Sequence, residues 1–312
     1  LRFLCANIRN LEMLTFSPIY QERPWGSNRL AKIFGRQVPS GLIGESWELG
    51  ELSEFHAQVA EGPLQGKHLG ELWRQGILGG KDHGAFPFLV KWLDTAMPLS
   101  VQVHPNASTC RPETMDRPKT EAWFVAHAEP QAELWAGLKN HTDPTCISAA
   151  CKNGTIIELL CRIEPQDHDM FLIPAGTVHA LGAGFLILEV QEPSDTTFRL
   201  YDWDRSGVDN KPRTLHLDAG SKAITYNKIG PIMQVRDKIL APTFSMQKIV
   251  QGASYPAENL RVFVATCEDL TLTNGHDRFS LKHGEIRVAE HSDGPLSLAS
   301  GSGVLITEDE IA

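Results

Sequence analysis

Short apolar runs separated by Pro and Gly recur along most of the chain and predict a protein built mainly of β-strands. Residues 13–66 already have this pattern, with turn residues every few positions. The later runs that predict strands lie at 86–106, which holds two of them, and at 120–128, 169–176, 184–192 and 196–204. Many short strands at this spacing indicate a β-sandwich or barrel.

Only two segments favour helices. Residues 68–80 carry Leu69, Leu72 and Leu78 at roughly helical spacing and end in a Gly-Gly pair, so we expect a short helix there. Residues 140–162 predict a second helix from their apolar positions. The predicted fold class is therefore all-β with helical insertions.

The chain is predicted to hold two units. Alternation of apolar and polar residues resumes at Thr243 and continues to the end of the chain. We therefore expect a larger unit over 13–240 and a smaller β unit over 241–312. The run at 170–180 can be laid over 303–312, which suggests that the smaller unit is a degenerate copy of the larger one.

Composition limits the class of partner. The 312 residues include 29 Lys and Arg against 38 Asp and Glu, a net charge of −9, and 42% of them are apolar. This acidic balance argues against nucleic acid or an anionic membrane surface as the main partner, because both demand basic patches. The window 171–188 carries no charge, but it contains Pro174 and several glycines, so we expect no membrane span.

Cysteine usage and the start of the chain add two expectations. The six cysteines form no C-x-x-C pair and are too irregularly spaced for a disulfide framework, which favours reduced thiols in a cytoplasmic protein. Residues 1–12 precede Met13 with charges that break any apolar run, so we expect an extension without functional weight.

Candidate chemistry gathers around two histidines. Gln102 and His104 alternate along one predicted strand and so project from the same face. Glu121 opens another strand, and His179 follows a turn that begins at Pro174. Two imidazoles, a carboxylate and an amide oxygen suit a borderline divalent ion such as zinc. A histidine in a strand is more often a hydrogen-bonded packing residue, so the spacing alone leaves both interpretations open.

The sequence also resembles a known family. Pro-x-Gly-x-x-His at 174–179 is similar to the second metal motif of the cupin superfamily. Around it, five blocks resemble the short form of the type I mannose-6-phosphate isomerases, in the family's order. They are Pro24-Trp25-Gly26, GESWELG at 44–50, LVKWLDTAMPLSVQVHPN at 89–106, KTEAWFV at 119–125 and the segment 173–205. The resemblance implies a zinc-dependent, reversible interconversion of mannose 6-phosphate and fructose 6-phosphate on a cupin (jelly-roll) barrel.

The resemblance also implies roles for individual residues. One zinc ion per chain would be held by Gln102, His104, Glu121 and His179. Arg199 is similar to the family's active-site arginine, and Lys119 resembles a lysine that lines the site. Two departures concern the loop over the sugar: Asn106 and Ala107 replace the usual acidic pair after His-Pro, and a Glu-containing turn follows residue 50 where a His-containing turn is common.

The implied reaction moves a proton between neighbouring carbons through an enediolate, which requires a base and a stabiliser of negative charge. We assign the stabilising role to Arg199. Lys119 is one candidate base, if zinc and Arg199 lower its pKa towards neutrality, and a zinc-bound water is the competing base. The predicted contacts to the phosphate or sugar are Ser100, Lys91, Arg205, Arg23 and Trp25.

Other conspicuous residues are interpreted as structural. The tryptophans expected in the core or in pocket walls are Trp47, Trp92, Trp123 and Trp203. The histidines expected at the surface or in packing are His56, His68, His83, His127, His141, His168, His216, His276, His283 and His291.

Two rival functions stay open: a non-catalytic metal-binding cupin that senses a sugar phosphate, and an iron-dependent cupin oxygenase. For the isomerase we expect a small-molecule sugar phosphate as the only partner, and a monomer or weak homodimer.

Overall fold

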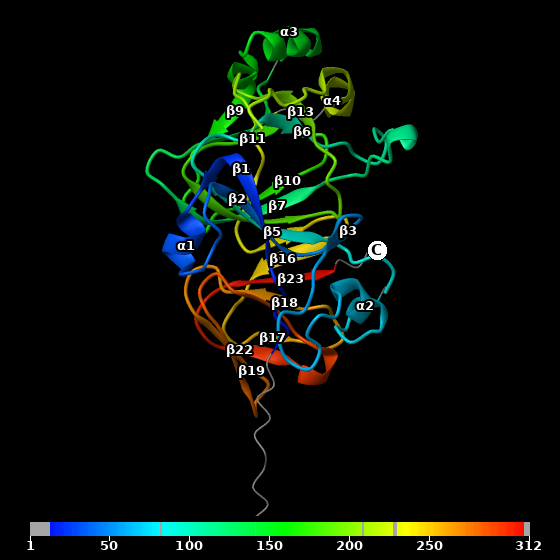
Figure 1. Cartoon of the computed structure of the whole chain (residues 1–312), viewed down its shortest axis with the longest axis vertical. Helices are drawn as coiled ribbons and strands as arrows, with labels where there is room; N and C mark the ends of the chain where they lie inside the picture. The colour runs from blue at the N-terminus through cyan, green and yellow to red at the C-terminus, as the bar shows by residue number, and fades with distance from the viewer. Residues whose placement is uncertain (1–12, 82, 141, 208, 227–229, 309–312) are drawn as a thin grey trace, which may run out of the picture.

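The computed structural model describes residues 13–81, 83–140, 142–207, 209–226 and 230–308. The predicted extension at 1–12 lies outside these residues, as does the end of the segment at 303–312 that resembles 170–180. Within them, no helix is both long and apolar enough to cross a membrane. Four β-sheets lie one below another along the long axis of the molecule (Figure 1).

The larger of the two upper sheets has seven strands, in the order β1-β2-β5-β12-β7-β10-β14. Their bounds are β1 Ile19–Ser27, β2 Ile43–Leu49, β5 Leu89–Thr95, β12 Phe185–Gln191, β7 Glu121–Ala128, β10 Met170–Ile173 and β14 Gln234–Val235. The five-stranded sheet above it has the order β13-β6-β11-β8-β9. Its bounds are β13 Phe198–Tyr201, β6 Val101–Val103, β11 His179–Leu181, β8 Leu134–Leu138 and β9 Leu160–Ile163.

The lower sheets come from the end of the chain. One has the order β15-β16-β23-β18-β21 and the other β17-β22-β19-β20. Their bounds are β15 Lys238–Leu240, β16 Phe244–Lys248, β23 Val304–Glu308, β18 Val262–Val264, β21 Ile286–Val288, β17 Ser254–Tyr255, β22 Leu296–Ser300, β19 Leu270–Thr273 and β20 Arg278–Leu281. A separate two-stranded ribbon is formed by β3 Glu51–Leu52 and β4 Phe55–His56.

The seven-stranded sheet is buried on both faces, and this decides which side chains reach the site. Along β12, Leu186 and Leu188 belong to the large core shared with the lower sheets, whereas Phe185 and Ile187 belong to the core between the two upper sheets. Because side chains alternate along a strand, Glu189 also faces the space between the upper sheets. A sheet covered on both sides gives continuous apolar runs, which the sequence shows here.

The helices are short. They are α1 Arg29–Phe34, α2 Leu69–Arg74, α3 Ile147–Lys152 and α4 Leu217–Ala223. The helix predicted over 68–80 is confirmed but ends early, with Gly76 in the left-handed region at φ 71°. Residues 140–162 form α3, 3₁₀ turns and the start of β9 in place of one helix. The sequence did not predict α1 and α4, because six or seven residues are too few for an apolar period to be recognised.

The structure confirms the all-β class with helical insertions. Apart from the ribbon of β3 and β4, strands up to β14 form the upper sheets, and strands from β15 onwards form the lower ones. The large core nevertheless joins both sets, with Trp92 and Phe244 among its members. The division at 240/241 therefore stays a prediction.

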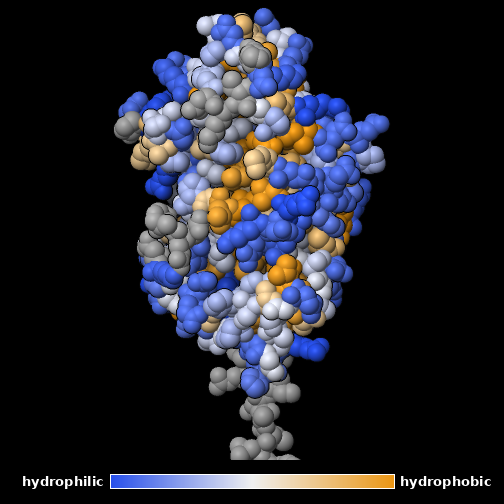
Figure 2. Space-filling view, turned by 180° about the vertical axis from the view of Figure 1, so that it is seen from behind, coloured by the Kyte–Doolittle hydropathy of each residue, from blue (hydrophilic) through white to orange (hydrophobic). Residues whose placement is uncertain are grey.

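Seen from behind, apolar side chains form a band across the middle of the molecule (Figure 2). An apolar hollow of about 440 Å³ is lined in part by Leu172, Ile232, Met233 and Val235, and Met233 is 78% exposed. Apolar atoms contribute more than half of a typical protein surface, so such a hollow is not by itself a sign of function.

Candidate metal centre

Three strands bring two imidazoles and a carboxylate together between the upper sheets. His104 directly follows β6, Glu121 opens β7, and His179 opens β11. Their ligand-type atoms all lie within 4.8 Å of one another, and all three residues are buried. The antiparallel pairing of β11 with β6 places His179 opposite Gln102, which adds the fourth predicted ligand to the cluster.

Backbone carbonyls fix the orientation of both imidazoles. His104 Nδ1 lies 2.8 Å from the carbonyl oxygen of Thr196, and His179 Nδ1 lies 2.9 Å from that of Thr177. A carbonyl can only accept, so each Nδ1 donates its proton, and each Nε2 keeps a lone pair that faces the cluster. An orienting bond of this kind is the usual support of a metal-binding histidine.

Several polar atoms of the cluster lack hydrogen bonds. His104 Nε2 and both carboxylate oxygens of Glu121 are buried and lack a hydrogen bond of good geometry, although Lys119 Nζ lies 2.8 Å from Glu121 Oε1. His104 Nε2 does lie 3.1 Å from Glu121 Oε1, and His179 Nε2 lies 3.6 Å from Glu121 Oε2. Orphaned buried acceptors are costly. A divalent cation would satisfy all of them, so the residues fit a metal ion.

Burial keeps both histidines in the state that a metal requires. It lowers the pKa of His179 to about 4, although Glu121 opposes the shift. Burial and the charge of Lys119 also lower the pKa of His104. Burial acts against ionisation of Glu121, but Lys119 and His104 outweigh it and lower the pKa of that carboxyl. Near neutral pH the cluster therefore presents two neutral imidazoles and one carboxylate.

Gln102 lies in reach of the cluster with its amide nitrogen inward. Its Nε2 is 3.3 Å from His179 Nε2, and its Oε1 accepts a hydrogen bond of 3.2 Å from Ser100 Oγ. A metal would need the oxygen on the inner side. A half-turn of the amide exchanges the two atoms without moving the strand.

Lys119 stands beside the cluster, with its Nζ 2.8 Å from Glu121 Oε1. We expected nearby positive charge to lower its pKa. Burial does act in that direction, but the charges of Glu121 and Glu189 outweigh it and raise the pKa of the Lys119 ammonium. The residues of the chain itself therefore hold Lys119 in its protonated form, and a lowering of its pKa by zinc stays a prediction.

The cluster forms one wall of a cavity of about 360 Å³. The cations that line it are Arg23, Lys91, Lys119, Arg199 and Arg213. Arg23 donates two hydrogen bonds to Glu45, at 2.9 and 3.2 Å. Lys91 Nζ lies 4.3 Å from the centre of the Trp47 ring and 4.0 Å from Glu189 Oε1. Although burial opposes it, Lys91 and Arg23 lower the pKa of Glu45 to about 2, so that carboxylate stays ionised.

Arg199 is the cation of this cavity whose charge is least compensated by carboxylates. Its Nη1 donates to the carbonyl oxygen of Thr214 at 3.0 Å, and its Nε is buried without a partner. None of the ion pairs found among the described residues includes Arg199. Burial and the neighbouring charges of Arg213 and Arg205 lower its pKa. A guanidinium that remains charged in such surroundings attracts an anion.

The structure brings most of the predicted substrate contacts to this cavity. Ser100, Lys91, Arg23 and Trp25 all line it. Arg205 does not: its guanidinium is bound to Asp202 and to the carbonyl oxygen of Pro98.

Arg213 lines the cavity instead, and it shares Asp202 with Arg205. The sequence analysis missed Arg213, because a contact between two loops carries no signal in spacing.

Two carboxylates were also missed. Glu189 is 5% exposed and accepts a hydrogen bond of 3.1 Å from Trp123 Nε1. Burial and the charge of Glu121, only partly offset by Lys119, raise the pKa of Glu189 to about 7. Asp195 lines the same cavity and is exposed. The alternation in β12 could have revealed Glu189, since it shares a face with Ile187.

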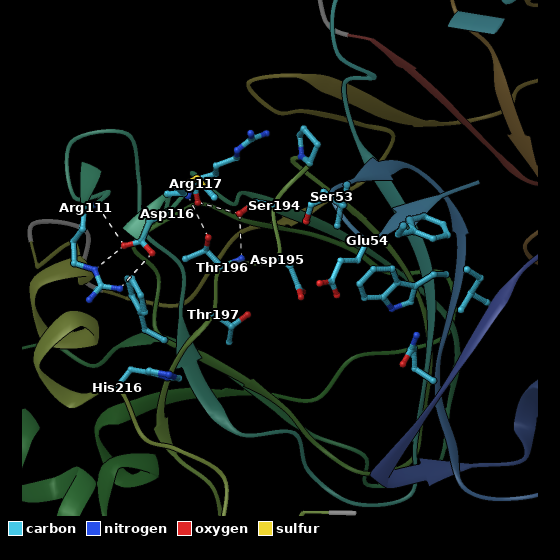
Figure 3. Close-up of a pocket in the computed structure, with 18 of the residues that line it drawn as sticks. Ser53, Glu54, Arg111, Asp116, Arg117, Ser194, Asp195, Thr196, Thr197 and His216 are labelled. Atoms are coloured by element: carbon cyan, nitrogen blue, oxygen red, sulfur yellow. Dashed lines mark hydrogen bonds and ion pairs between the residues drawn. The ribbon is translucent and has the colours of Figure 1, made fainter. Parts of the chain in front are cut away.

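A larger outer pocket of about 660 Å³ adjoins the inner cavity, because both are lined by Arg23, Asp195 and Thr197. Arg111 and Asp116 lie on one side of it, and Ser53 and Glu54 lie on the opposite side (Figure 3). The two pockets are therefore continuous with each other at these residues.

The four tryptophans were interpreted correctly. Trp92 and Trp123 are core residues, Trp47 is 9% exposed and lines the outer pocket, and Trp203 packs half-buried against Trp135. The five described cysteines are all free.

Comparisons with known proteins identify relatives of the chain. A family model described as the catalytic domain of phosphomannose isomerase type I matches residues 13–120. The chain is 38% identical over 222 residues to the probable mannose-6-phosphate isomerase GmuF of Bacillus subtilis, with 70% of each protein covered. It is 39% identical over 221 residues to mannose-6-phosphate isomerase ManA of the same organism, again with 70% of each covered.

Solved structures give the same result. The mannose 6-phosphate isomerase of Bacillus subtilis matches with a TM-score of 0.83 at 28% identity, covering 96% of this chain and 100% of that one. A zinc-bound mannose 6-phosphate isomerase matches with a TM-score of 0.68 at 16% identity, over 96% of this chain and 100% of that one, which shows likeness of fold.

Proposed function

Because the chain belongs to the type I phosphomannose isomerase family, we propose that it interconverts mannose 6-phosphate and fructose 6-phosphate with a bound zinc ion. Membership makes the protein an isomerase, and it confirms the resemblance and the expected fold class. The substrate is taken from the names of the relatives. The observation that carries the proposal is the buried cluster of His104, Glu121 and His179, with its orphaned acceptors, on the wall of a cationic cavity.

The residues that would hold the zinc ion are His104, Glu121, His179 and, after the half-turn of its amide, Gln102. When bound, zinc would supply positive charge that polarises the oxygens of the substrate. The chain itself supplies the dry surroundings, because His104, Glu121 and His179 are each no more than 1% exposed. Charges act more strongly in such a site than in water.

Arg199 is proposed to stabilise the enediolate. It lies opposite Gln102 in the pairing of β13 with β6, so its backbone is adjacent to the ligand set. Its free Nε–H and its charge are available to a developing oxyanion. The nearby Arg213 adds positive charge without taking up the donors of Arg199.

Lys119 and Glu189 are the two groups of the cavity proposed to assist the proton transfer. Lys119 stays in our assignment, but its raised pKa keeps it protonated in the resting cavity, so it would donate a hydrogen bond to a substrate oxygen. Glu189, with a pKa of about 7, can accept a proton near neutral pH, as a general base must. A zinc-bound water is the competing base. If it is the base, replacing Glu189 would not change the rate at which the substrate proton exchanges with solvent.

The phosphate is proposed to bind where Arg23 and Arg213 face the cavity, with Ser100 as a hydroxyl donor. Arg23 also lines the outer pocket, so it lies where the two pockets meet. Lys91 and Trp25 stay proposed contacts of the sugar. Arg205 acts only through Asp202, which it shares with Arg213.

A coupled assay on mannose 6-phosphate with and without chelator tests the function. We expect activity that chelation abolishes and added zinc restores, with about one zinc per chain. His179→Ala should lose zinc, whereas His127→Ala, whose ring is remote from the cluster in a surface ion pair with Asp167, should keep both zinc and activity. Full zinc occupancy in His179→Ala would remove that residue from the ligand set.

The rival functions give different outcomes in the same preparation. A sensor would bind the sugar phosphate without turnover, and an iron-dependent oxygenase would consume oxygen. The cytoplasmic location and the monomer or weak homodimer stay predictions.

A further inference from the structure

His216 is joined to Arg199 by two reciprocal hydrogen bonds. The backbone N–H of His216 donates to the carbonyl oxygen of Arg199 at 2.7 Å, and the backbone N–H of Arg199 donates to Nδ1 of the His216 ring at 3.1 Å. Two positions earlier, the carbonyl oxygen of Thr214 accepts from the Arg199 guanidinium at 3.0 Å. The short segment 214–216 therefore contacts Arg199 at its backbone and at its side chain.

This contact falls where β13 is irregular. The pairing of β13 with β6 shifts register between Arg199 and Tyr201, which is a bulge. At a bulge the ladder of a sheet no longer fixes every backbone group, so an outside partner can decide the direction of a side chain. The backbone carbonyl oxygen of His216 also accepts a hydrogen bond of 2.7 Å from the N–H of Gly220. His216 therefore connects Arg199 to the start of α4.

We propose that His216 is a positioning residue for Arg199, and that it works only while its ring is neutral. The bond from the Arg199 N–H needs a lone pair on Nδ1, so the single ring proton must be on Nε2. A second proton turns Nδ1 into a donor, which faces the donor of Arg199 and places a further positive charge beside the guanidinium. The bond is then lost, and acid releases Arg199 from its place. This inference rests on the proposed role of Arg199 in isomerisation.

The charged groups around the ring favour its neutral form. Arg199 on β13 and Arg111 in the loop 106–118 are positive, while Asp116 in that loop is negative. Burial and the two arginines outweigh Asp116 and lower the pKa of His216. On its own helix, Asp218 is exposed and bonded to Lys222. The hydrogen bond from the Arg199 N–H to the His216 ring is therefore present at neutral pH. It is lost only below the ordinary titration range of a histidine, about pH 6.5.

The test compares two substitutions of His216 in the zinc-loaded enzyme. The side-chain oxygen of Asn lies as many bonds from the backbone as Nδ1 of His, so His216→Asn keeps an acceptor that does not titrate. His216→Ala has no acceptor.

We expect His216→Ala to lower kcat about 10-fold, the usual effect of one lost hydrogen bond, with zinc content and KM changed less than about 2-fold. We expect His216→Asn to restore most of kcat near pH 8, and its rate relative to wild type to rise as pH falls below the ordinary titration range of a histidine. His127→Asn is the matched control and should follow the wild-type profile.

The inference is overturned if His216→Ala keeps wild-type kcat, or if the rate of His216→Asn relative to wild type is flat from about pH 5 to 8. It is also overturned if nitrogen NMR at neutral pH finds the His216 proton on Nδ1, a readout that needs no turnover. Failure of the proposed function looks different, because the zinc-loaded wild type would then not isomerise mannose 6-phosphate at all.

Discussion

The buried carboxyl of Glu189 allows a prediction in which stability and activity change in opposite directions. Burial and the charge of Glu121 raise its pKa from 4.5 to about 7, although Lys119 and Lys91 pull the other way. The folded protein therefore binds this proton more tightly than the unfolded chain does. Stability from this group is complete below pH 4.5 and is lost as pH rises through about 7.

The size of the loss follows from the same values. Each pH unit over which only the folded state holds the proton changes the free energy of unfolding by about 1.4 kcal/mol. Over the interval from 4.5 to about 7 this amounts to about 3 kcal/mol against the folded state. Glu189→Gln removes the charge, and its amide oxygen can still accept the hydrogen bond from Trp123 Nε1. The variant should therefore be more stable than wild type by up to about 3 kcal/mol near pH 8, and about equal to it near pH 4.5.

Urea unfolding of the chelated protein at several pH values measures this difference. The same variant, loaded with zinc, should lose about 100-fold or more in kcat, because Gln cannot carry the proton. Glu54→Gln, at an exposed position of the outer pocket, is the matched control and should change the free energy of unfolding by less than about 0.5 kcal/mol at each pH. The reasoning fails if Glu189→Gln gains the same stability at every pH, or if it is less stable than wild type near pH 8.

Three further predictions concern Arg199, the shared Asp202 and the core. Arg199→Ala should lower kcat about 100- to 1,000-fold with zinc content unchanged, and loss of zinc with an unchanged rate per zinc would show that the role assigned to Arg199 is wrong. Arg213→Met should raise KM for the sugar phosphate at least about 10-fold. Arg205→Met, its matched control outside the cavity, should raise KM less than about 3-fold, and equal effects would refute the proposed phosphate contact. Phe244→Ala should lower the free energy of unfolding by about 3–5 kcal/mol in urea, since this fully buried ring lies in the core that joins the upper and lower sheets, and a loss below about 1 kcal/mol would contradict that packing.

Local patterns predicted the strands, and the family resemblance predicted the residues that the structure brings together as a candidate metal centre. Alternation along a strand placed Gln102 and His104 on one face, and the five family blocks supplied the partners. The structure adds the cause of convergence: β11 pairs with β6, so His179 lies directly opposite Gln102. Strand pairing of this kind joins residues far apart in sequence and leaves no trace in periodicity.

Charges in the cavity were harder to predict, because a pKa depends on distances that the sequence does not contain. Zinc and Arg199 were expected to lower the pKa of Lys119, whereas among the residues of the chain the charges of Glu121 and Glu189 outweigh burial and raise it. Glu189 itself was overlooked in a run of apolar residues. β12 is covered on both faces, and a charged side chain is rare in such a strand. The same burial raises the pKa of the Glu189 carboxyl into the range suited to proton transfer.

Arg205 and Arg213 differ in how well their guanidinium groups can reach a ligand in the cavity. Both contact Asp202, and only Arg213 lines the cavity. Charge and proximity in sequence favoured Arg205, which lies within the family block at 173–205. An arginine whose donors are occupied by a carboxylate and a backbone carbonyl has little left for a ligand. By the same criterion Arg199, whose Nε–H is buried without a partner, has a donor left for a ligand.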